Sequence, residues 1–582
     1  MNRNVESHFS ELPSAEIQRS IFDRSCSYKT SFNAGRLIPF YVDEVLPGDT
    51  FDVTTAKVVR SQTLLTPLMD NMYLDTYYFF VPNRLCWEHW QEFCGENTKS
   101  AWAPKTEYAM PVIVPPAGGF ASGTIADYMG LPVGVEWKAT DDLAPMVLPL
   151  RAYALICNEF FRDENLTDPL LIPTDDANQS GSNGDSYISD VANGGMPFRV
   201  SKYHDYYSSA LPAPQKGQAV GIPIQVPAFN GGNFPVRTFS EPFPAADKHY
   251  PITGNWLSFP RGTSFPLDER LEMTVDPSDH MHGFGPVGGF GVINTAAYFT
   301  PNEGNPNKSF EFDNLGVVIP PENDGRTTDV SFSVNELRLA FAYQRYLEAL
   351  ARGGSRYTEI LLGLFGVRSP DARLQRPEYL GGNRIPVSVS EVTNSAQSEQ
   401  DFLGDLGAKS STSDVNHDFT KSFTEHGWVI GVCCVRYDHS YSQGLQRFWT
   451  RKEFTDYYNP KFAHLGEVPV YQAELYANGN FTKVRIFGYQ EIWADYRYKP
   501  NMVTGEMRPG VKNTLAHWNL ADYYTEPPTL CDGWIREDVA NVDRALAVTS
   551  SVSNQFWADI YVQNKCTRCM PMYSVPGLID HF

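Results

Sequence analysis

The residues of this chain that could do chemistry fall into a few short motifs. Gly283, Gly285 and Gly288 spell G-x-G-x-x-G, the pattern of a loop that binds a dinucleotide. Such a loop follows a strand and opens a helix, but here Pro286 lies inside the motif and neither flank has a strand or helix pattern. We therefore interpret the motif as a glycine-rich loop without a cofactor.

A histidine pair lies just before this loop. His280 and His282 form an H-x-H motif, which supplies two metal ligands in cupins. A cupin site needs a glutamate a few residues later, and the next glutamate in this chain is Glu303. We interpret the pair as a surface feature, and a fortuitous metal site is the alternative.

The nine cysteines are scattered, and Cys566 and Cys569 form a single C-x-x-C pair. Zinc binding would require a second pair at a comparable spacing, which the sequence lacks. A redox role would require a helix N-terminus, whereas a strand pattern precedes this pair and a proline follows it. We expect structural thiols here. The adjacent Cys433 and Cys434 should point to opposite faces of a strand.

Two carboxylate pairs, Asp141 with Asp142 and Asp163 with Glu164, are of a kind found in hydrolases. Neither is accompanied by a motif that would position a nucleophile or a base. P-loop, G-x-S-x-G and H-E-x-x-H motifs are absent from the sequence. We predict no catalytic residue, no metal site and no cofactor, and a protein whose function is assembly.

The composition indicates a folded, acidic chain. Of 582 residues, 42% are hydrophobic and 13% aromatic, enough for a large core, although the number of domains stays open. The formal charge of -21 argues against bulk attraction to nucleic acid, so contact with a genome should be local. The apolar runs at 360–367 and 428–435 are too short to cross a bilayer, and the N-terminus lacks a secretory signal. We expect no membrane span, and free thiols in a reducing cytoplasm.

Hydrophobic periodicity predicts the elements that must position these residues. Alternation predicts strands over residues 51–62 and 555–565, and an aromatic-rich run closed by Pro82 predicts a strand over 72–81. A run that is apolar on both faces predicts a strand deep in a sandwich over 427–438. Helical spacing predicts a helix over 149–161 and a buried helix pair over 333–366, with a Ser333–Glu336 capping box at its start. Separated strands with long excursions between them favour a mainly β, antiparallel two-sheet jelly roll.

Several runs carry a resemblance to a known family. The segments GGSRYTEIL and FGVRSPDARLQRPEYLGG closely resemble the major capsid protein of gokushoviruses, a branch of the Microviridae, and so do RSIFDRSCSYKTSFNAGRLIPFYVDEVLPGDTF, MDNMYLDTYYFFVPNRL and KYHDYYSSALPAPQKG. The resemblance covers most of 16–220 and 333–582. It implies an eight-stranded jelly roll of the viral capsid type with long loop and helical insertions, which assembles into a T=1 icosahedral shell of sixty subunits around circular single-stranded DNA.

The expected organisation follows from this resemblance and from composition. Residues 1–35 are polar and are expected to form an arm on the inner face of the shell, with Arg3, Arg19, Arg24 and Lys29. Residues 36–220 and 329–582 are expected to build the shell domain. Between them, the glycine- and proline-rich residues 221–328 are expected to form a variable insertion, which builds the threefold protrusion in the family.

Two surfaces are candidates for binding. The insertion is a candidate for host attachment, since loop-borne insertions often hold specificity; its candidate residues are His280, His282, Phe284 and Phe290. The basic and aromatic segment after the helix pair is a candidate for subunit contact, favoured over contact with DNA; its residues are Arg368, Arg373, Arg376, Tyr379 and Arg384.

The resemblance also implies partners: encapsidated DNA, a small basic DNA-binding protein, an internal scaffolding protein, a DNA pilot protein and a host surface receptor. The expected location is the virion, after assembly in the cytoplasm of a bacterial host. Two alternatives on the same fold stay open at this point. They are a lectin-like carbohydrate-binding module, which should carry a secretory signal, and a cupin-like metal protein.

Overall fold

The computed structural model describes residues 18–96, 107–217, 334–353, 375–393, 406–479 and 484–573, with short strands between residues 236 and 318. The chain divides into two compact units, one made of residues 1–218 and 345–582 and the other of residues 219–344. In the second unit, β12 (Leu315–Val318) pairs with β8 (Val236–Thr238) and β9 (His249–Pro251), and β10 (Trp256–Leu257) pairs with β11 (Phe310–Glu311).

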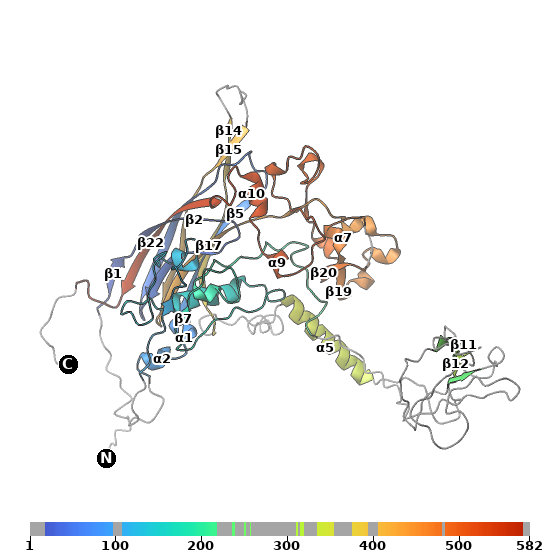
Figure 1. Cartoon of the computed structure of the whole chain (residues 1–582), viewed down its shortest axis with the longest axis horizontal. Coiled ribbons are helices and arrows are strands. Elements are labelled where there is room, and N and C mark those ends of the chain that lie inside the picture. The colour runs from blue at the N-terminus through green and yellow to red at the C-terminus, as the bar shows by residue number, and fades with distance from the viewer. Residues whose placement is uncertain are drawn as a thin grey trace, which may run out of the picture. The chain divides into compact units, whose positions relative to one another are not determined.

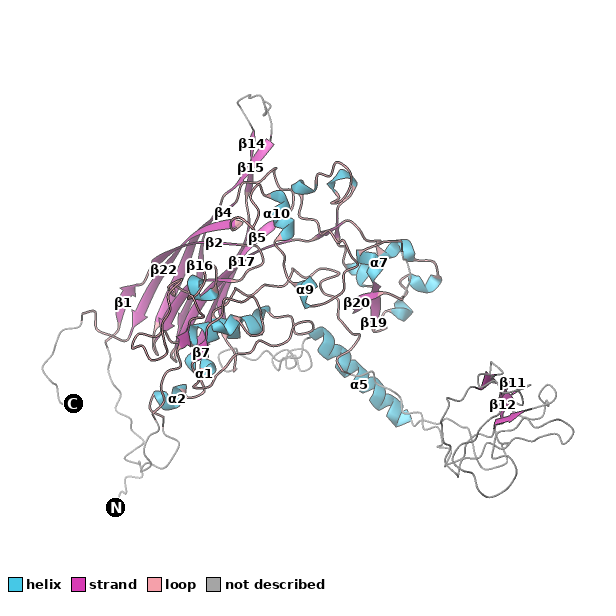
Figure 2. Ribbon diagram, in the orientation of Figure 1, coloured by secondary structure: helices cyan, strands magenta, loops and turns pink. Residues whose placement is uncertain are grey.

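Two antiparallel sheets form the centre of the larger unit (Figure 2). The first sheet contains, in spatial order, β2 (Cys26–Phe32), β22 (Phe556–Arg568), β4 (Thr50–Ser61) and β16 (Thr412–Ser422). The second contains β13 (Glu378–Pro386), β5 (Met72–Pro82), β17 (Gly427–Tyr437) and β3 (Ile38–Val45). Because the chain passes repeatedly from one sheet to the other, this is a jelly roll, and the predicted fold class is confirmed.

A further strand, β1 (Ser20–Asp23), makes the first sheet five-stranded. It pairs with β22 along the same edge as β2, since Ser20 lies opposite Arg568 and Cys26 lies opposite Val562. β1 and β2 therefore act as one interrupted edge strand. The predicted pairing of the last strand with an early one is also confirmed, because β22 pairs with β4 along almost its whole length.

Alternation of side chains places the main core between the two sheets. Along β22, inward residues are at most 5% exposed and outward ones face solvent, as period-two patterning requires. The inward residues of β5, in the other sheet, pack against these inward residues of β22. Members of this core include Phe51, Val53, Val59, Leu74, Tyr78, Val429, Cys433, Phe556, Ile560 and Val562.

One buried cation crosses this interior. Lys57 of β4 has a fully buried side chain, and its Nζ lies 3.1 Å from the Asp414 carboxylate of β16. The same Nζ lies 3.4 Å from Thr76 of the opposite sheet. A buried charge requires such partners, so this contact fixes the register of the two sheets as well as satisfying the amine.

A third layer covers the outer face of the second sheet. It contains α1 (Asn83–Cys86), α3 (Ile125–Tyr128) and α4 (Leu148–Ile156), and α4 continues into a π-helical turn, η1 (Cys157–Phe161). The predicted helix at 149–161 is thus confirmed. β17 is buried on both faces because Cys433 faces the inter-sheet core and Cys434 faces this helical layer, as predicted.

Long connections emerge from the sheets (Figure 1). Residues 83–377 join β5 to β13 and add α2 (Trp90–Phe93), β6 (Ile113–Val114), β7 (Gln179–Ser180), η2 (Val191–Asn193) and α5 (Val334–Gly353). β14 (Val389–Thr393) and β15 (Leu406–Ser410) form a hairpin. Residues 438–555 join β17 to β22 and contain β18 (Ser440–Tyr441), η5 (Arg447–Thr450), η6 (Phe454–Asp456), η7 (Pro460–Phe462), β19 (Glu467–Tyr471), α7 (Gln472–Leu475), β20 (Ile486–Glu491), α8 (Ala494–Arg497), β21 (Asn501–Met502), η8 (Gly505–Met507), η9 (Ala516–Trp518), α9 (Asp532–Ile535) and α10 (Ala540–Ala545).

Two sequence predictions are wrong in part. Residues 20–32 of the predicted arm are strands, because their backbone completes the free edge of β22; residues 1–17 lie outside the described part. The helix at 333–353 exists, but its predicted apolar stripe is not buried throughout. Leu347 is 8% exposed, whereas Phe341 is 57% exposed. The capping residue Ser333 and the second helix of the predicted pair lie outside the described residues.

The core assignment of β22 can be tested with one matched pair of substitutions. Val562→Ala should lower the free energy of unfolding by about 2–3 kcal/mol, because the buried side chain leaves a cavity. Val415→Ala makes the same chemical change on β16, where the side chain is 71% exposed, and should cost less than about 0.5 kcal/mol. Urea unfolding of the unassembled subunit measures both. Equal losses would contradict the assigned inward face.

Candidate functional site

A group of charges surrounds one carboxylate, Asp75 of β5. Its side chain points away from the inter-sheet core, because the neighbouring Leu74 points into it, and it is fully buried. Arg384 of β13 lies directly opposite in the sheet and donates from Nε at 2.8 Å. Arg436 of β17 donates from Nε at 3.1 Å, and the Tyr203 hydroxyl donates at 2.9 Å.

Tyr203 links the two arginines. The guanidinium carbons of Arg384 and Arg436 lie 4.2 Å and 4.3 Å from the centre of its ring, within the range of cation–π attraction. Burial, together with the charge of Asp75, raises the pKa of Tyr203, so its hydroxyl stays protonated and acts as a donor. We call Asp75, Tyr203, Arg384 and Arg436 the Asp75 clamp.

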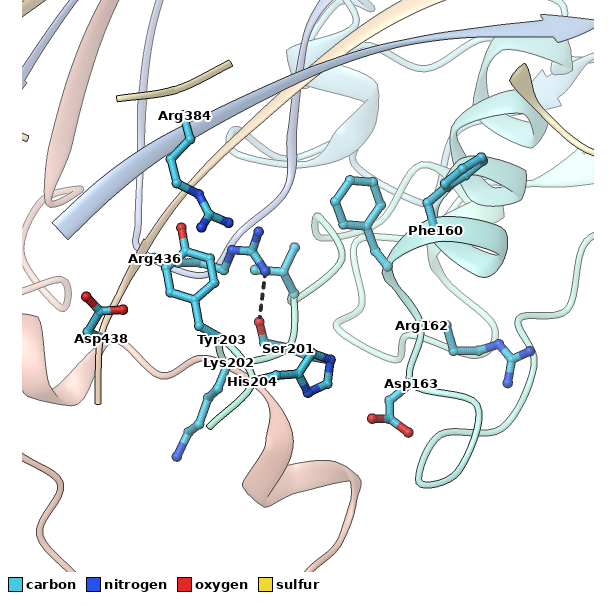
Figure 3. A pocket seen from close by; sticks show the side chains of 12 residues that line it. Phe160, Arg162, Asp163, Ser201, Lys202, Tyr203, His204, Arg384, Arg436 and Asp438 are labelled. Carbon is cyan, nitrogen blue, oxygen red and sulfur yellow. Dashed lines mark hydrogen bonds between the residues drawn. The ribbon is translucent and has the colours of Figure 1, made fainter. Parts of the chain in front are cut away.

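A cavity of about 500 Å³ opens beside the clamp (Figure 3). Its walls are polar and combine Arg384, Arg436 and Lys202 with Asp163 and Asp438. The Arg384 side chain is 51% exposed, and no described residue accepts a hydrogen bond from its two Nη atoms. A guanidinium held at Nε and open at Nη can take a carboxylate or phosphate group from another molecule. The arrangement therefore suits contact with an anionic group of another molecule.

A buried ionic network lies behind the cavity. Lys202 Nζ is 3.1 Å from Asp522, His439 Nδ1 is 2.8 Å from Asp522, and His439 Nε2 is 3.1 Å from Glu537. All four side chains are at most 7% exposed. Burial alone would lower the pKa of His439, but the carboxylates of Glu537 and Asp522 together raise it to about 9. The network joins both long connections to the end of β17.

The structure brings three of the five residues of the predicted basic segment to this side of the second sheet. Arg376 lies 5.4 Å from the ring of Phe160. Tyr379 of β13 is 42% exposed and packs 5.6 Å from Phe79. Arg384 belongs to the clamp. Arg368 and Arg373 lie outside the described residues.

Two of the predicted arm residues are bound within the chain. Arg24 forms an ion pair with the buried Asp43, and Lys29 lies 3.4 Å from Asp559 with both side chains exposed. Arg19 is exposed, and Arg3 lies outside the described part. His280, His282, Phe284 and Phe290 also lie outside it, and so do the glycines of the G-x-G-x-x-G motif.

The cysteine motif behaves as a pair of thiols in the described structure. Cys566 is buried on β22, where burial raises its pKa to about 11, so it is no reactive thiolate. Cys569 is partly exposed, with its Sγ 3.9 Å from the Gly48 carbonyl oxygen, and both are free. Within the described ranges, no group of three His, Cys, Asp or Glu side chains could hold a metal ion. No helix there is long and apolar enough to cross a membrane.

Sequence reasoning missed most of the clamp and all of the buried network. Asp75 had one usable signal, since it is the single charge in the apolar run MYLDTYYFFV. Tyr203, Arg436 and His439 had none, because their partners lie 83 or more residues away in the chain. Only the pairing of strands brings them together.

Comparison with known proteins gives a consistent result. A family model described as capsid protein (F protein) matches residues 10–578. Capsid protein VP1 of Chlamydia phage 1 is 40% identical over 604 residues, covering 99% of this chain and 98% of the relative. VP1 of Spiroplasma virus 4 is 37% identical, covering 94% and 93%, and VP1 of Bdellovibrio phage phiMH2K is 35% identical, covering 100% and 99%. The family model therefore also spans the insertion 221–328, which the motif resemblance did not cover.

The capsid family match places this jelly roll in the shell-forming class of structural proteins, which are not enzymes. The chain belongs to the capsid F protein family and is a major capsid protein of a Microviridae phage, of the gokushovirus type. It is a component of the virion and self-assembles into a capsid. The prediction of a capsid protein is confirmed over the lectin-like and cupin-like alternatives.

The buried network predicts a loss of stability in alkali. His439 has a folded-state pKa of about 9 against 6.5 for the free side chain, so it contributes about 3 kcal/mol that is fully present below pH 6.5. That contribution declines as pH rises towards 9 and is lost above it. His439→Asn should remove this part of the pH dependence of the unfolding free energy, measured by urea titration between pH 6 and 10.

The control is His417→Asn, because the His417 side chain is 56% exposed on the first sheet. This variant should keep the wild-type pH profile. An unchanged profile in His439→Asn would mean that the imidazole is not held as a cation.

Proposed function

We propose that sixty copies of this chain close into a T=1 icosahedral shell around circular single-stranded DNA. The observation that carries the proposal is a match over nearly the full length of both chains to phage capsid proteins VP1, on a jelly-roll frame. Closed symmetry requires several self-consistent contacts per subunit, with about 1,000 Å² or more of buried area for a specific contact. The long connections between the strands supply such surfaces.

The genome must be held without bulk positive charge. A chain with a formal charge of -21 repels phosphate at long range, so its DNA contacts are few and local. A small basic DNA-binding protein of the same virus neutralises most of the genome. An internal scaffolding protein and a DNA pilot protein complete the set of viral partners, and assembly takes place in the cytoplasm of the bacterial host. Within this proposal, the inner arm is reduced to the residues before β1, with Arg3 and Arg19 directed to the interior.

The insertion 221–328 is proposed to face outward as the threefold protrusion and to bind the host surface receptor. This proposal is supported by the division of the chain into two compact units, one of which consists of residues 219–344. A separate unit can vary without disturbing the jelly-roll core. His280, His282, Phe284 and Phe290 are the proposed receptor-facing residues.

The basic segment is proposed to act in subunit contact more than in genome contact. In the described part, Arg384 is anchored by a buried carboxylate and has free donors, and Tyr379 of the same strand is half exposed. Anchored arginines and tyrosines are typical of interface centres. Arg368, Arg373 and Arg376 are proposed to belong to the same contact.

The T=1 shell can be tested by electron microscopy. The particles are purified from cells that express the chain together with the rest of its phage genome. Uniform icosahedral particles with sixty copies of this chain, containing nuclease-protected circular single-stranded DNA, are expected. Nuclease treatment of particles broken open by denaturant is the control. A chain that stays monomeric beside all other products of its genome would contradict the proposal.

Deletion of residues 230–320, replaced by a short glycine–serine linker, tests the role of the insertion. Particle yield should remain within about twofold of wild type, whereas adsorption of particles to host cells should be lost, because the receptor-binding surface is gone. The double substitution of His280→Ala and His282→Ala is a milder test of the same surface. If the deletion instead yields insoluble protein, the insertion is part of the folding core.

A further inference from the structure

The connection between β17 and β22 carries exposed aromatic side chains that neither the Asp75 clamp nor the buried network uses. They come from two segments around η5, η6 and α8, near α7 in Figure 1. Exposed fractions range from 48% to 73%. We call this set the aromatic surface: Phe448, Trp449, Phe454, Tyr457, Tyr458, Tyr496 and Tyr498.

The members of the aromatic surface are neighbours in space. The Arg451 guanidinium lies 4.1 Å from the centre of the Tyr496 ring and 5.8 Å from that of Tyr457. The rings of Tyr458 and Tyr496 lie 6.4 Å apart. A hollow of about 260 Å³ lies among them, lined in part by Phe448, Arg451, Tyr496 and Tyr498. The surface is thus continuous, with a depression that a side chain could fill.

The scaffold below these rings is held by hydrogen bonds. The indole of buried Trp493 donates to the Phe462 carbonyl at 2.9 Å and packs against Tyr458. Arg451 forms an ion pair with Asp495, which fixes the two segments to each other. Rings held in this way lose little conformational freedom when they are covered, so covering them is favourable. A soluble monomer rarely exposes so many large aromatic residues together, and such patches are typical of protein interfaces.

The charges on this surface indicate what covers it. Its arginines are already satisfied, since Arg447, Arg451 and Arg497 pair with Glu474, Asp495 and Glu491. Its lysines form no ion pair with a described residue; they are Lys452, Lys461 and Lys499. Engaged arginines disfavour a phosphate backbone, which would have to displace the carboxylates. Exposed lysines on these segments, of which Lys499 lines the hollow, instead fit an apolar surface edged with carboxylates.

The same chain presents a surface of that kind in residues 132–146, which we call the acidic loop. Its aliphatic side chains are exposed, with Leu143 at 93% and Val135 at 47%. Val133 and Met146 are also exposed, beside the carboxylates of Glu136, Asp141 and Asp142. The loop is pinned in place because the Trp137 indole donates to the Ile113 carbonyl at 2.7 Å and the Lys138 amide donates to Asp141 at 2.8 Å.

We propose that the aromatic surface of one subunit packs on the acidic loop of a second copy of the chain. Two different patches in contact make a heterologous interface, which repeats around a rotation axis and closes into a ring. Rings of Tyr, Trp and Phe cover the aliphatic side chains, and the free lysines meet the carboxylates. The proposal depends on self-assembly, which family membership establishes, and not on the T=1 arrangement or on host attachment.

A charge exchange tests the contact. Lys499→Glu alone and Asp142→Lys alone should each lower the yield of assembled particles about tenfold. The double variant should recover most of the yield, because it restores an oppositely charged pair with the two signs exchanged. Trp449→Ser should also lower the yield about tenfold, whereas Trp557→Ser, on a 44%-exposed tryptophan of β22, is the matched control and should not. Particles and free subunits are separated by sucrose-gradient sedimentation from cells that carry the other phage genes.

Circular dichroism and thermal unfolding of the free subunits should be unchanged, since all the substituted side chains are exposed in the subunit. Wild-type yield in both single charge variants, or no recovery in the double variant, would overturn the proposed pair. So would a Trp449→Ser variant that assembles normally but loses binding to a fluorescent single-stranded oligonucleotide, since the surface would then bind DNA. Wild-type particles of another symmetry would refute the T=1 shell without affecting this comparison of variants.

Discussion

The pairing of β22 with β4 is the interaction on which the rest of the structure depends. It pairs residues 556–567 with residues 50–61 in antiparallel order, so strands near the two ends of the chain lie side by side in the centre of the first sheet. Without it, the inward residues of both strands would have no core to enter, and the interrupted edge strand β1–β2 would have no partner. Because this contact spans almost the whole sequence, the chain must bring its ends together before the core forms, which makes slow folding the physical expectation.

Once the two sheets are closed, the long connections can vary in length at little cost, since loop-closure entropy grows only slowly with length. They are nevertheless not free of the sheets. The ion pairs among Lys202, His439, Asp522 and Glu537 tie both long connections to the end of β17. Buried charges of this kind add little net stability compared with apolar packing, but removal of one partner is costly, so they act mainly to specify how the connections attach. The Asp75 clamp does the same for β13, β5 and β17.

The function of this capsid protein resides in surfaces rather than in a reacting centre. Clamp and network hold carboxylates and cations in fixed pairs, which leaves them poor candidates for proton transfer and good candidates for rigid support. The clamp supports the half-exposed Arg384, and the Trp493 hydrogen bond and the Arg451–Asp495 ion pair support the aromatic surface of the β17–β22 connection. Rigid presentation matters because each subunit must meet its neighbours many times with the same geometry, and a loosely held side chain would add an ordering cost to every contact in the shell.

The sequence by itself determined the local elements and the family. Alternation marked β4 and β22, an aromatic-rich run marked β5, and two-sided hydrophobicity marked β17 with its opposed cysteines. Long idiosyncratic motifs identified the capsid family. Periodicity could not decide which apolar stripe is covered, so Phe341 was expected inside and is exposed. Nor could it show that residues 20–32 complete the edge of β22, or that Asp75, Tyr203 and Arg436 converge. Those outcomes depend on pairing between segments far apart in the chain, and local patterns carry no information about which distant partner a residue meets.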